Sequence, residues 1–203
     1  MAVFQQPPPL KIKCTDFDCD KDLHCFKAHR KMPKADHGKC RACGADLVDW
    51  DRVHKRDFSD VTYTFEALQQ ELIRHHHFHK RIDDKAVRYA RRKGRTLLMD
   101  AVRHRLEKYL APASPPRDGY QTPFDGNPIY YAQHATACCC RTCLAYWHDI
   151  PKGRPLTEEE MDYCVELVEL YFEQRLPQLG DDPEKVPPNR KRADDEPDES
   201  ELP

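Results

Sequence analysis

Ten cysteines and eleven histidines are the residues of this 203-residue chain most suited to chemistry. Nine of the cysteines and five of the histidines gather in two places, the first fifty residues and the stretch HATACCCRTCLAYWH at 134–148. Thiolates and imidazoles at such short spacing are the ligands that Zn²⁺ prefers in a tetrahedral site. The sequence therefore predicts a metal-binding protein with zinc as its cofactor, one ion in each cluster.

In the second cluster, Cys140 and Cys143 form a CxxC knuckle, with His134 upstream and His148 downstream. These four side chains make a complete zinc ligand set, and Cys139 is the alternate to Cys140. We interpret the site as a structural zinc site. A catalytic site with one coordination position open for water is an alternative, as are an iron–sulfur cluster and a reactive thiol beside His134.

The first cluster offers five cysteines for about four ligand positions, in the pattern of a zinc ribbon. The expected ligands are Cys14, Cys19, Cys40 and Cys43. The alternate ligand is Cys25, and the spare donors are His24, His29 and His37. Ribbons contact nucleic acid or protein, but simple structural support is the interpretation we favour.

A run of histidines, HHHFH at 75–79, follows Glu71 in a segment with helical spacing. His75 and His79 are i, i+4 neighbours, and Glu71 lies one turn before His75. These three are the candidate catalytic residues of an enzymatic hypothesis, with His134 and a metal at the second knuckle. Hydrogen-bonded core histidines are the interpretation that we favour for this run.

Charge is distributed unevenly along the chain. Residues 74–108 hold twelve Lys or Arg against four acids, whereas 181–203 hold nine acids against four bases. A clustered basic face is the electrostatic footprint of phosphate contact, and a solvated helix face covered by the acidic tail is the alternative. The candidate nucleic-acid-binding residues are Arg88, Arg91, Arg92, Lys93, Arg95, Arg103, Lys152 and Arg154.

The elements that must position these side chains are mostly helical. Apolar spacing predicts helices over 63–79, 83–94 and 96–110, with Asp83 as a cap and Gly94 as a stop. Another helix starts at the capping box TEEE, 157–160, and buries Cys164. Short strands are expected at 47–50 and 129–132. We therefore predict an α+β fold, mostly helical with short β elements, in small domains stapled by metal.

Composition divides the chain into four parts. We predict a disordered lead-in (1–10), a zinc-ribbon-like N-terminal module (11–60), a helical domain (61–176) and a disordered acidic tail (177–203). With 39% hydrophobic residues the core is thin, so cross-links such as metals are expected. No signal-peptide pattern and no apolar run of ~20 residues is present, so we expect a cytoplasmic protein without a membrane partner.

Several motifs in the second half resemble an uncharacterised bacterial and phage family that is known only as a domain of unknown function. They are LAPA (110–113), DGYQTP (118–123), QHATA (133–137), CCRTCL (139–144), WH (147–148) and IPKGR (150–154). The resemblance spans residues 109–176 and implies no activity, because none is assigned to the family. Cys138 stands where the family has Thr, and Asn127 where it has His; the N-terminal module looks like an addition.

The leading functional hypothesis is a zinc-binding protein that contacts nucleic acid or a protein partner through the basic helices of 74–108. The alternative is a metal-dependent hydrolase or nuclease that uses the second cluster with His75 and His79. A third hypothesis is an adaptor that captures a partner with its acidic tail. Nucleotide-binding, zincin, deaminase, kinase and hydrolase-elbow motifs are all missing from the sequence, so these classes are not favoured.

Overall fold

The computed structural model describes residues 12–116 and 122–187, and the predicted lead-in lies outside them. Seven α-helices are assigned in the described residues: α1 Trp50–His54, α2 Val61–Leu68, α3 Leu72–His79, α4 Asp84–Tyr109, α5 Pro128–Ala135, α6 Arg141–Trp147 and α7 Glu158–Arg175. Three short 3-10 helices lie at Cys19–Lys21, Lys34–Asp36 and Phe58–Asp60. The fold is helical and carries Cys/His clusters that could hold metal.

The predicted short β elements are wrong. Within the described ranges the β structure is limited to two isolated bridges, Asp18 with Leu23 and His24 with Glu71. The segment expected as a strand at 129–132 is part of α5, which Asn127 caps by accepting from the N–H of Ile129 and in which Pro128 occupies the first turn. Similarly, Asp49 caps α1 where a strand was expected to end.

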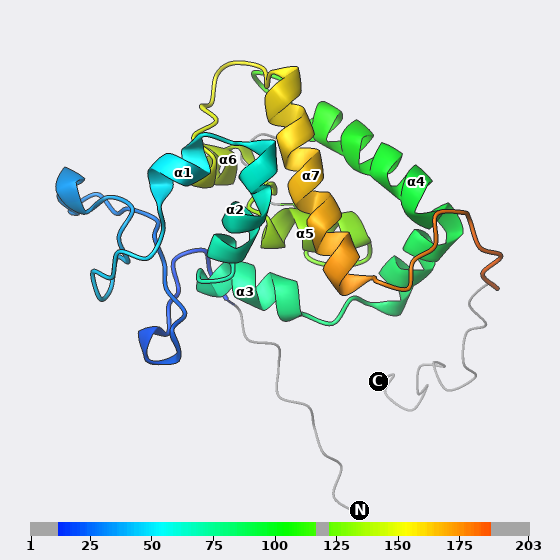
Figure 1. Ribbon diagram of the computed structural model, residues 1–203, viewed down its shortest axis with the longest axis horizontal. Helices are drawn as coiled ribbons and strands as arrows, with labels where there is room; N and C mark the ends of the chain where they lie inside the picture. The colour runs from blue at the N-terminus through cyan, green and yellow to red at the C-terminus, as the bar shows by residue number, and fades with distance from the viewer. Residues whose placement is uncertain (1–11, 117–121, 188–203) are drawn as a thin grey trace, which may run out of the picture.

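Helix α7 organises the core. Its capping box is present as predicted: the Thr157 hydroxyl accepts from the Glu160 N–H, and the Glu160 carboxylate accepts from the Thr157 N–H. The apolar side of α7, which includes the fully buried Cys164, packs against α2, α4 and α5. Figure 1 shows α7 crossing the middle of the molecule, with α4 on one side and the N-terminal module beyond α2 on the other.

The helix predicted over 63–79 is two helices, because a contact from the N-terminal module interrupts it. The His24 N–H donates to the Gln70 carbonyl over 2.8 Å, and the Leu72 N–H donates to the His24 carbonyl over 2.9 Å. These bonds hold Glu71 in extended backbone between α2 and α3. The module is thereby fixed to the helical domain at the start of α3.

An aromatic cluster joins the N-terminal module to α6. The ring centroids of Trp50 and Trp147 are 5.0 Å apart, and those of Phe26 and Trp147 are 6.0 Å apart. The Trp50 indole N–H donates to the Gly38 carbonyl over 2.8 Å. The module and the helical domain therefore share one core.

Gly94 kinks α4, in agreement with the predicted stop, because its φ of 67° lies in the left-handed region. The segment after α7 packs into this kink: the Arg95 N–H donates to the Gly180 carbonyl and the Glu184 N–H to the Arg91 carbonyl, each over 2.8 Å. The predicted acidic tail therefore does not begin at 177. Residues 177–187 belong to the packed structure, and 188–203 lie outside the described residues.

Gly94→Ala is expected to destabilise the protein by at least about 2 kcal/mol. A left-handed conformation costs a side-chain-bearing residue about 1–2 kcal/mol, and a Cβ at this position would lie 2.3 Å from the Asp181 carbonyl oxygen. Urea unfolding of the full chain measures the change. Gly153→Ala is the matched control, since its φ is +82° and no atom lies within 4 Å of a Cβ there. Equal losses in the two variants would contradict the packing of 179–184 against α4.

Candidate metal centres and a basic groove

Four potential metal ligands of the N-terminal module come together in the first cluster, Cys19, His24, Cys40 and Cys43, whose ligand atoms all lie within 4.8 Å of one another. The Cys19 and Cys40 sulfurs are 3.7 Å apart, and the Cys43 sulfur lies 3.5 Å from His24 Nδ1. Three thiols and one imidazole are a four-ligand set of the kind that structural zinc sites use.

Local backbone geometry prepares the first cluster. The Cys40–Cys43 knuckle is closed by the Gly44 N–H, which donates to the Cys40 carbonyl over 2.8 Å. Burial opposes ionisation of Cys40, but backbone N–H groups of Cys43 and Ala42, with the His24 ring, outweigh it and lower the pKa of this thiol to about 6. The knuckle therefore favours a thiolate, which is the form that binds metal.

His24 is oriented as a ligand by a neighbouring carboxylate. Its Nε2 pairs with Asp22 Oδ1 over 2.9 Å, which leaves Nδ1 toward Cys43. Carboxylate–histidine pairing of this kind fixes the ring of many zinc ligands. His24, expected only as a spare donor, thus replaces Cys14 in this cluster, and Cys25 also lies outside it.

The second cluster consists of Cys139, Cys140 and Cys143, whose sulfurs all lie within 4.8 Å of one another. Cys140 is the residue before α6, and Cys143 lies in the first turns of that helix. The helix N-terminus favours negative charge, so it suits thiolates. Cys139, expected as an alternate to Cys140, joins it in the cluster.

The two histidines expected in the second cluster are not part of it. His134 Nε2 pairs with the Thr122 carbonyl over 2.9 Å, and its ring stacks on His77 with the centroids 4.5 Å apart. His148 Nε2 pairs with the Thr136 carbonyl over 3.0 Å. Burial, chiefly, lowers the pKa of His134 to about 4, so this ring is neutral in the core. Sequence proximity placed both histidines near the thiols, but α5 and α6 turn them toward backbone carbonyls.

Arg74 is the buried cation of the second cluster, and no local sequence pattern indicates this role. Its guanidinium donates to the Cys143 sulfur over 3.2 Å, to the Cys139 sulfur over 3.8 Å and to the His134 carbonyl over 2.7 Å. Burial opposes its charge, but the thiols of Cys143 and Cys139 and the Glu71 carboxylate raise its pKa. Arg74 therefore opposes the rise in the pKa of Cys139 and Cys143 that the neighbouring thiols and burial cause.

Glu71 is the anchor of Arg74 and is not an available base. Its carboxylate accepts from Arg74 Nε over 3.0 Å, from the Tyr146 hydroxyl over 2.8 Å and from the Trp147 indole N–H over 2.7 Å. His75 and His79 stack on each other near the surface, with the centroids 4.0 Å apart. The structure thus separates the candidate catalytic trio into a buried salt bridge and a pair of outer histidines.

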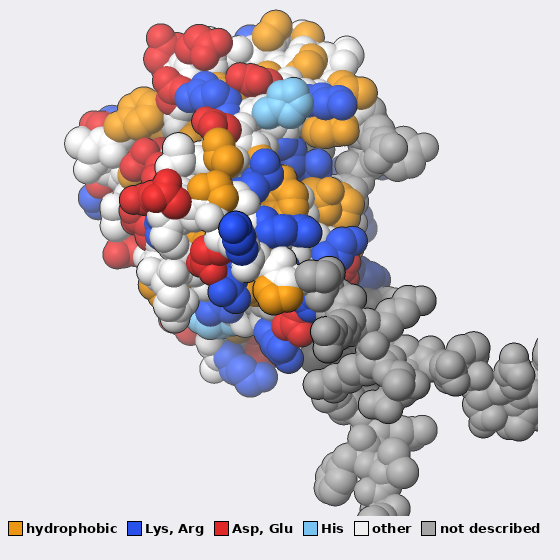
Figure 2. Space-filling view, turned by 90° about the vertical axis from the view of Figure 1, so that its right-hand side faces the viewer, with side chains coloured by type: hydrophobic (Ala, Val, Ile, Leu, Met, Phe, Trp, Pro, Cys, Tyr) orange, Lys and Arg blue, Asp and Glu red, His pale blue; other side chains and the backbone are white. Residues whose placement is uncertain are grey.

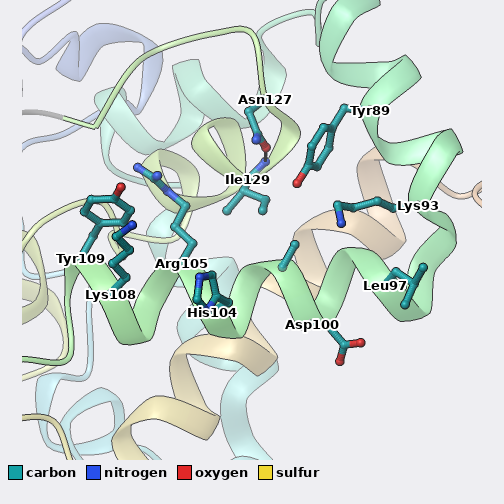
Figure 3. Close-up of a pocket in the computed structure, with 11 residues that line it drawn as sticks. Tyr89, Lys93, Leu97, Asp100, His104, Arg105, Lys108, Tyr109, Asn127 and Ile129 are labelled. Carbon is teal, nitrogen blue, oxygen red and sulfur yellow. Dashed lines mark hydrogen bonds between the residues drawn. The ribbon is translucent and has the colours of Figure 1, made fainter.

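A groove of about 470 Å³ lies between α4 and the start of α5 (Figure 3). Its basic lining residues are Lys93, His104, Arg105 and Lys108, and Asp100 is the single acid among the described residues that line it. Its aromatic lining residues are Tyr89 and Tyr109. The kink at Gly94 turns the two halves of α4 toward one another, so residues from both halves line the same groove.

Cations and aromatic rings alternate along this groove. Arg105 lies over two rings, with its Cζ 4.9 Å from the centroid of Tyr109 and 4.4 Å from that of Tyr130. Lys108 lies over Tyr109 at 5.4 Å, and Lys93 over Tyr89 at 5.5 Å. Arg105 Nε is held by Gln133 Oε1 over 2.7 Å, so the guanidinium is fixed in position. Such cation–π pairs preorganise a surface that presents charge and flat rings together.

The eight predicted basic residues differ in their ion pairs, their exposure and their distance from the groove lining. Arg91 pairs with Glu184, Arg103 with Asp162 and Glu158, and Arg154 with Glu160. Arg92 and Lys152 are exposed, and Arg88 and Arg95 are half-buried. Lys93 is the one of the eight predicted residues that lines the groove. Figure 2, which faces the α4 side of the molecule, shows basic side chains gathered over its centre with hydrophobic side chains between them.

Comparison with known proteins identifies a matching family but no matching solved structure. Residues 62–173 match the model of a family described as "Domain of unknown function (DUF4186)". The match covers more than half of the chain and contains the second cluster and the groove, whereas the first cluster precedes it. It also begins upstream of the predicted start at 109. No solved structure matches the chain. None of the helices in the described ranges is long and apolar enough to cross a membrane.

Proposed function

We propose that this chain, which belongs to the DUF4186 family, binds single-stranded nucleic acid through its basic groove, while zinc ions hold the surrounding structure together. The groove between α4 and α5 is the observation that carries this proposal. Its cations suit phosphates, and its tyrosine rings suit unpaired bases. A protein partner would be less well matched, because the groove combines several cations with a single acid.

The ligand sets favour zinc and a structural role for it. Thiolates with one imidazole at the first cluster, and thiolates alone at the second, are soft donors that select zinc over oxygen-preferring cations. All ten cysteines are free of disulfides, as a reducing cytoplasm would maintain them. The first cluster is closed by four protein ligands, so it offers no coordination position for a substrate.

The contacts of the candidate catalytic residues favour binding over hydrolysis. Glu71 is 1% exposed and satisfied by three donors, so it has no lone pair directed at solvent. The groove lies on α4 and α5 and contains no cysteine. A metal-activated water would therefore act outside the surface that we assign to nucleic acid.

Replacing both lysines of the groove, Lys93→Ala with Lys108→Ala, should weaken binding of a fluorescent single-stranded oligonucleotide about tenfold at low salt, which is roughly 1.4 kcal/mol. Each lost phosphate contact should make the log–log salt dependence shallower by about 0.7. Anisotropy titrations of the full chain at two or more salt concentrations measure both effects.

The matched control is Lys34→Ala with Lys55→Ala, which removes the same charge from exposed positions outside the groove. Tyr109→Ser separates base stacking from charge, since it should lower affinity by about 1–3 kcal/mol per stacked base and leave the salt dependence unchanged. If the groove pair and the control pair weaken oligonucleotide binding equally, the interaction is a nonspecific charge attraction and does not use the groove. If no salt-sensitive binding is detected, the proposal is overturned.

A further inference from the structure

The second cluster has three thiols, whereas a closed zinc site has four ligands. We infer that Cys14 is the fourth ligand, so that one Cys₄ metal site is built jointly by the N-terminal module and the DUF4186 domain. This inference rests on the metal-binding half of the proposed function and is independent of the nucleic-acid half. It turns the second cluster from a local knuckle into a cross-link between residues more than a hundred positions apart.

Cys14 is left over from the first cluster. The four ligands there are complete without it, and His24 holds the position that Cys14 was expected to take. Cys14 itself is half-buried, whereas Cys25 is fully buried. A half-buried thiol that has no place in the nearer cluster is available to another ion.

The path of the chain brings Cys14 to the start of α3. The Cys25 sulfur contacts the Cys14 carbonyl oxygen at 3.6 Å, and the neighbouring residue His24 is paired with Gln70 and Leu72. These two contacts place the segment around Cys14 next to the turn that leads into Arg74. In Figure 1 the described chain begins beside α3, in agreement with these contacts.

Arg74 connects the start of α3, where the Cys14 segment lies, to the second cluster. Its guanidinium donates to the sulfurs of Cys139 and Cys143. Arg74 lies in the first turn of α3, three residues after Glu71, whose backbone pairs with that of His24. The segment that carries Cys14 and the thiols of the second cluster therefore both lie near the start of α3, and Arg74 would offset part of the negative charge of a Cys₄ zinc site.

The other metal donors near the second cluster make contacts that direct them away from the fourth ligand position. The His134 ring stacks on His77 and Phe124, with the centroids 4.5 and 4.8 Å apart, and the His148 ring lies against Tyr163, with the centroids 5.5 Å apart. Cys138 contacts the Thr136 carbonyl through its sulfur at 3.5 Å. The competing arrangement is three thiolates with a water, which would leave an open coordination position.

Cobalt substitution of the full chain tests this inference. Wild-type protein is expected to bind two Co²⁺ ions through seven thiolates, and Cys14→Ser should remove one-seventh of the thiolate-to-cobalt charge-transfer absorption. The same variant should release one of its two zinc ions to a competing chelator at least tenfold faster, while the other ion is released at the wild-type rate. Cys14→His, which retains a donor, should recover slow release.

A control variant and two distinct outcomes keep the inference separate from the proposed function. Thr15→Ala changes an exposed neighbour and should match wild type. Unchanged cobalt absorption and zinc release in Cys14→Ser would overturn the inference and assign the fourth position to water. Wild-type protein that binds no zinc or cobalt would instead overturn the metal-binding half of the proposed function.

Discussion

Removal of the bound metal by a chelator is expected to unfold the N-terminal module and to destabilise the helical domain. The module contains short 3-10 helices and turns, and its two halves are joined at the first cluster. A structural zinc site contributes roughly 10–16 kcal/mol of apparent binding free energy, whereas a whole domain is stable by about 5–15 kcal/mol. Losing it therefore removes most of the stability of the module.

Hydrogen exchange of the full chain under reducing conditions, with and without chelator, measures this effect by segment. Fast exchange should appear first across 12–60, and α6 should follow because Trp147 packs against Trp50. Cys40→Ser with Cys43→Ser should reproduce the loss in the module, while Cys140→Ser with Cys143→Ser should act first on α6. Exchange that stays slow in both segments after metal removal would contradict a structural role.

Glu71→Ala is expected to destabilise the protein by about 3–5 kcal/mol, which is typical of breaking a buried ion pair by removing one partner. The substitution leaves Arg74 charged in the core and deprives the Tyr146 hydroxyl and the Trp147 indole of their acceptor. It should also weaken metal retention at the second cluster, because Arg74 is held against those sulfurs by Glu71. Urea unfolding and zinc content of the same samples measure the two effects.

Glu71→Gln retains an acceptor oxygen and nearly the same volume, so it should cost less than Glu71→Ala. His79→Ala removes the outer member of the predicted trio and should change stability by no more than about 0.5 kcal/mol, since His79 is exposed. If Glu71→Ala and His79→Ala had similar small effects, Glu71 would not be the anchor that its three contacts indicate.

Local signals in the sequence identified much of the fold. The Thr157 capping box, the Asp83 cap and the Gly94 stop are each present where the pattern indicated. The strand expected at 129–132 is wrong because its short apolar run does not distinguish strand from helix, and Asn127 with Pro128 starts a helix there. The helix expected over 63–79 is interrupted because His24, from a distant segment, bonds to the backbone between α2 and α3.

The sequence by itself determined that soft metal donors gather in two clusters, because CxxC spacing places two thiols around one tight turn whatever the rest of the chain does. It also determined that α4 is basic. Tertiary structure alone decided which donors complete each cluster: His24 entered the first cluster, and His134 and His148 turned away from the second. It likewise brought Arg74 to the cluster thiols and folded Lys93 and Arg105 into one groove across the Gly94 kink. The physical reason is that these arrangements depend on the kink within α4 and on contacts between segments far apart in the chain, about which local spacing carries no information.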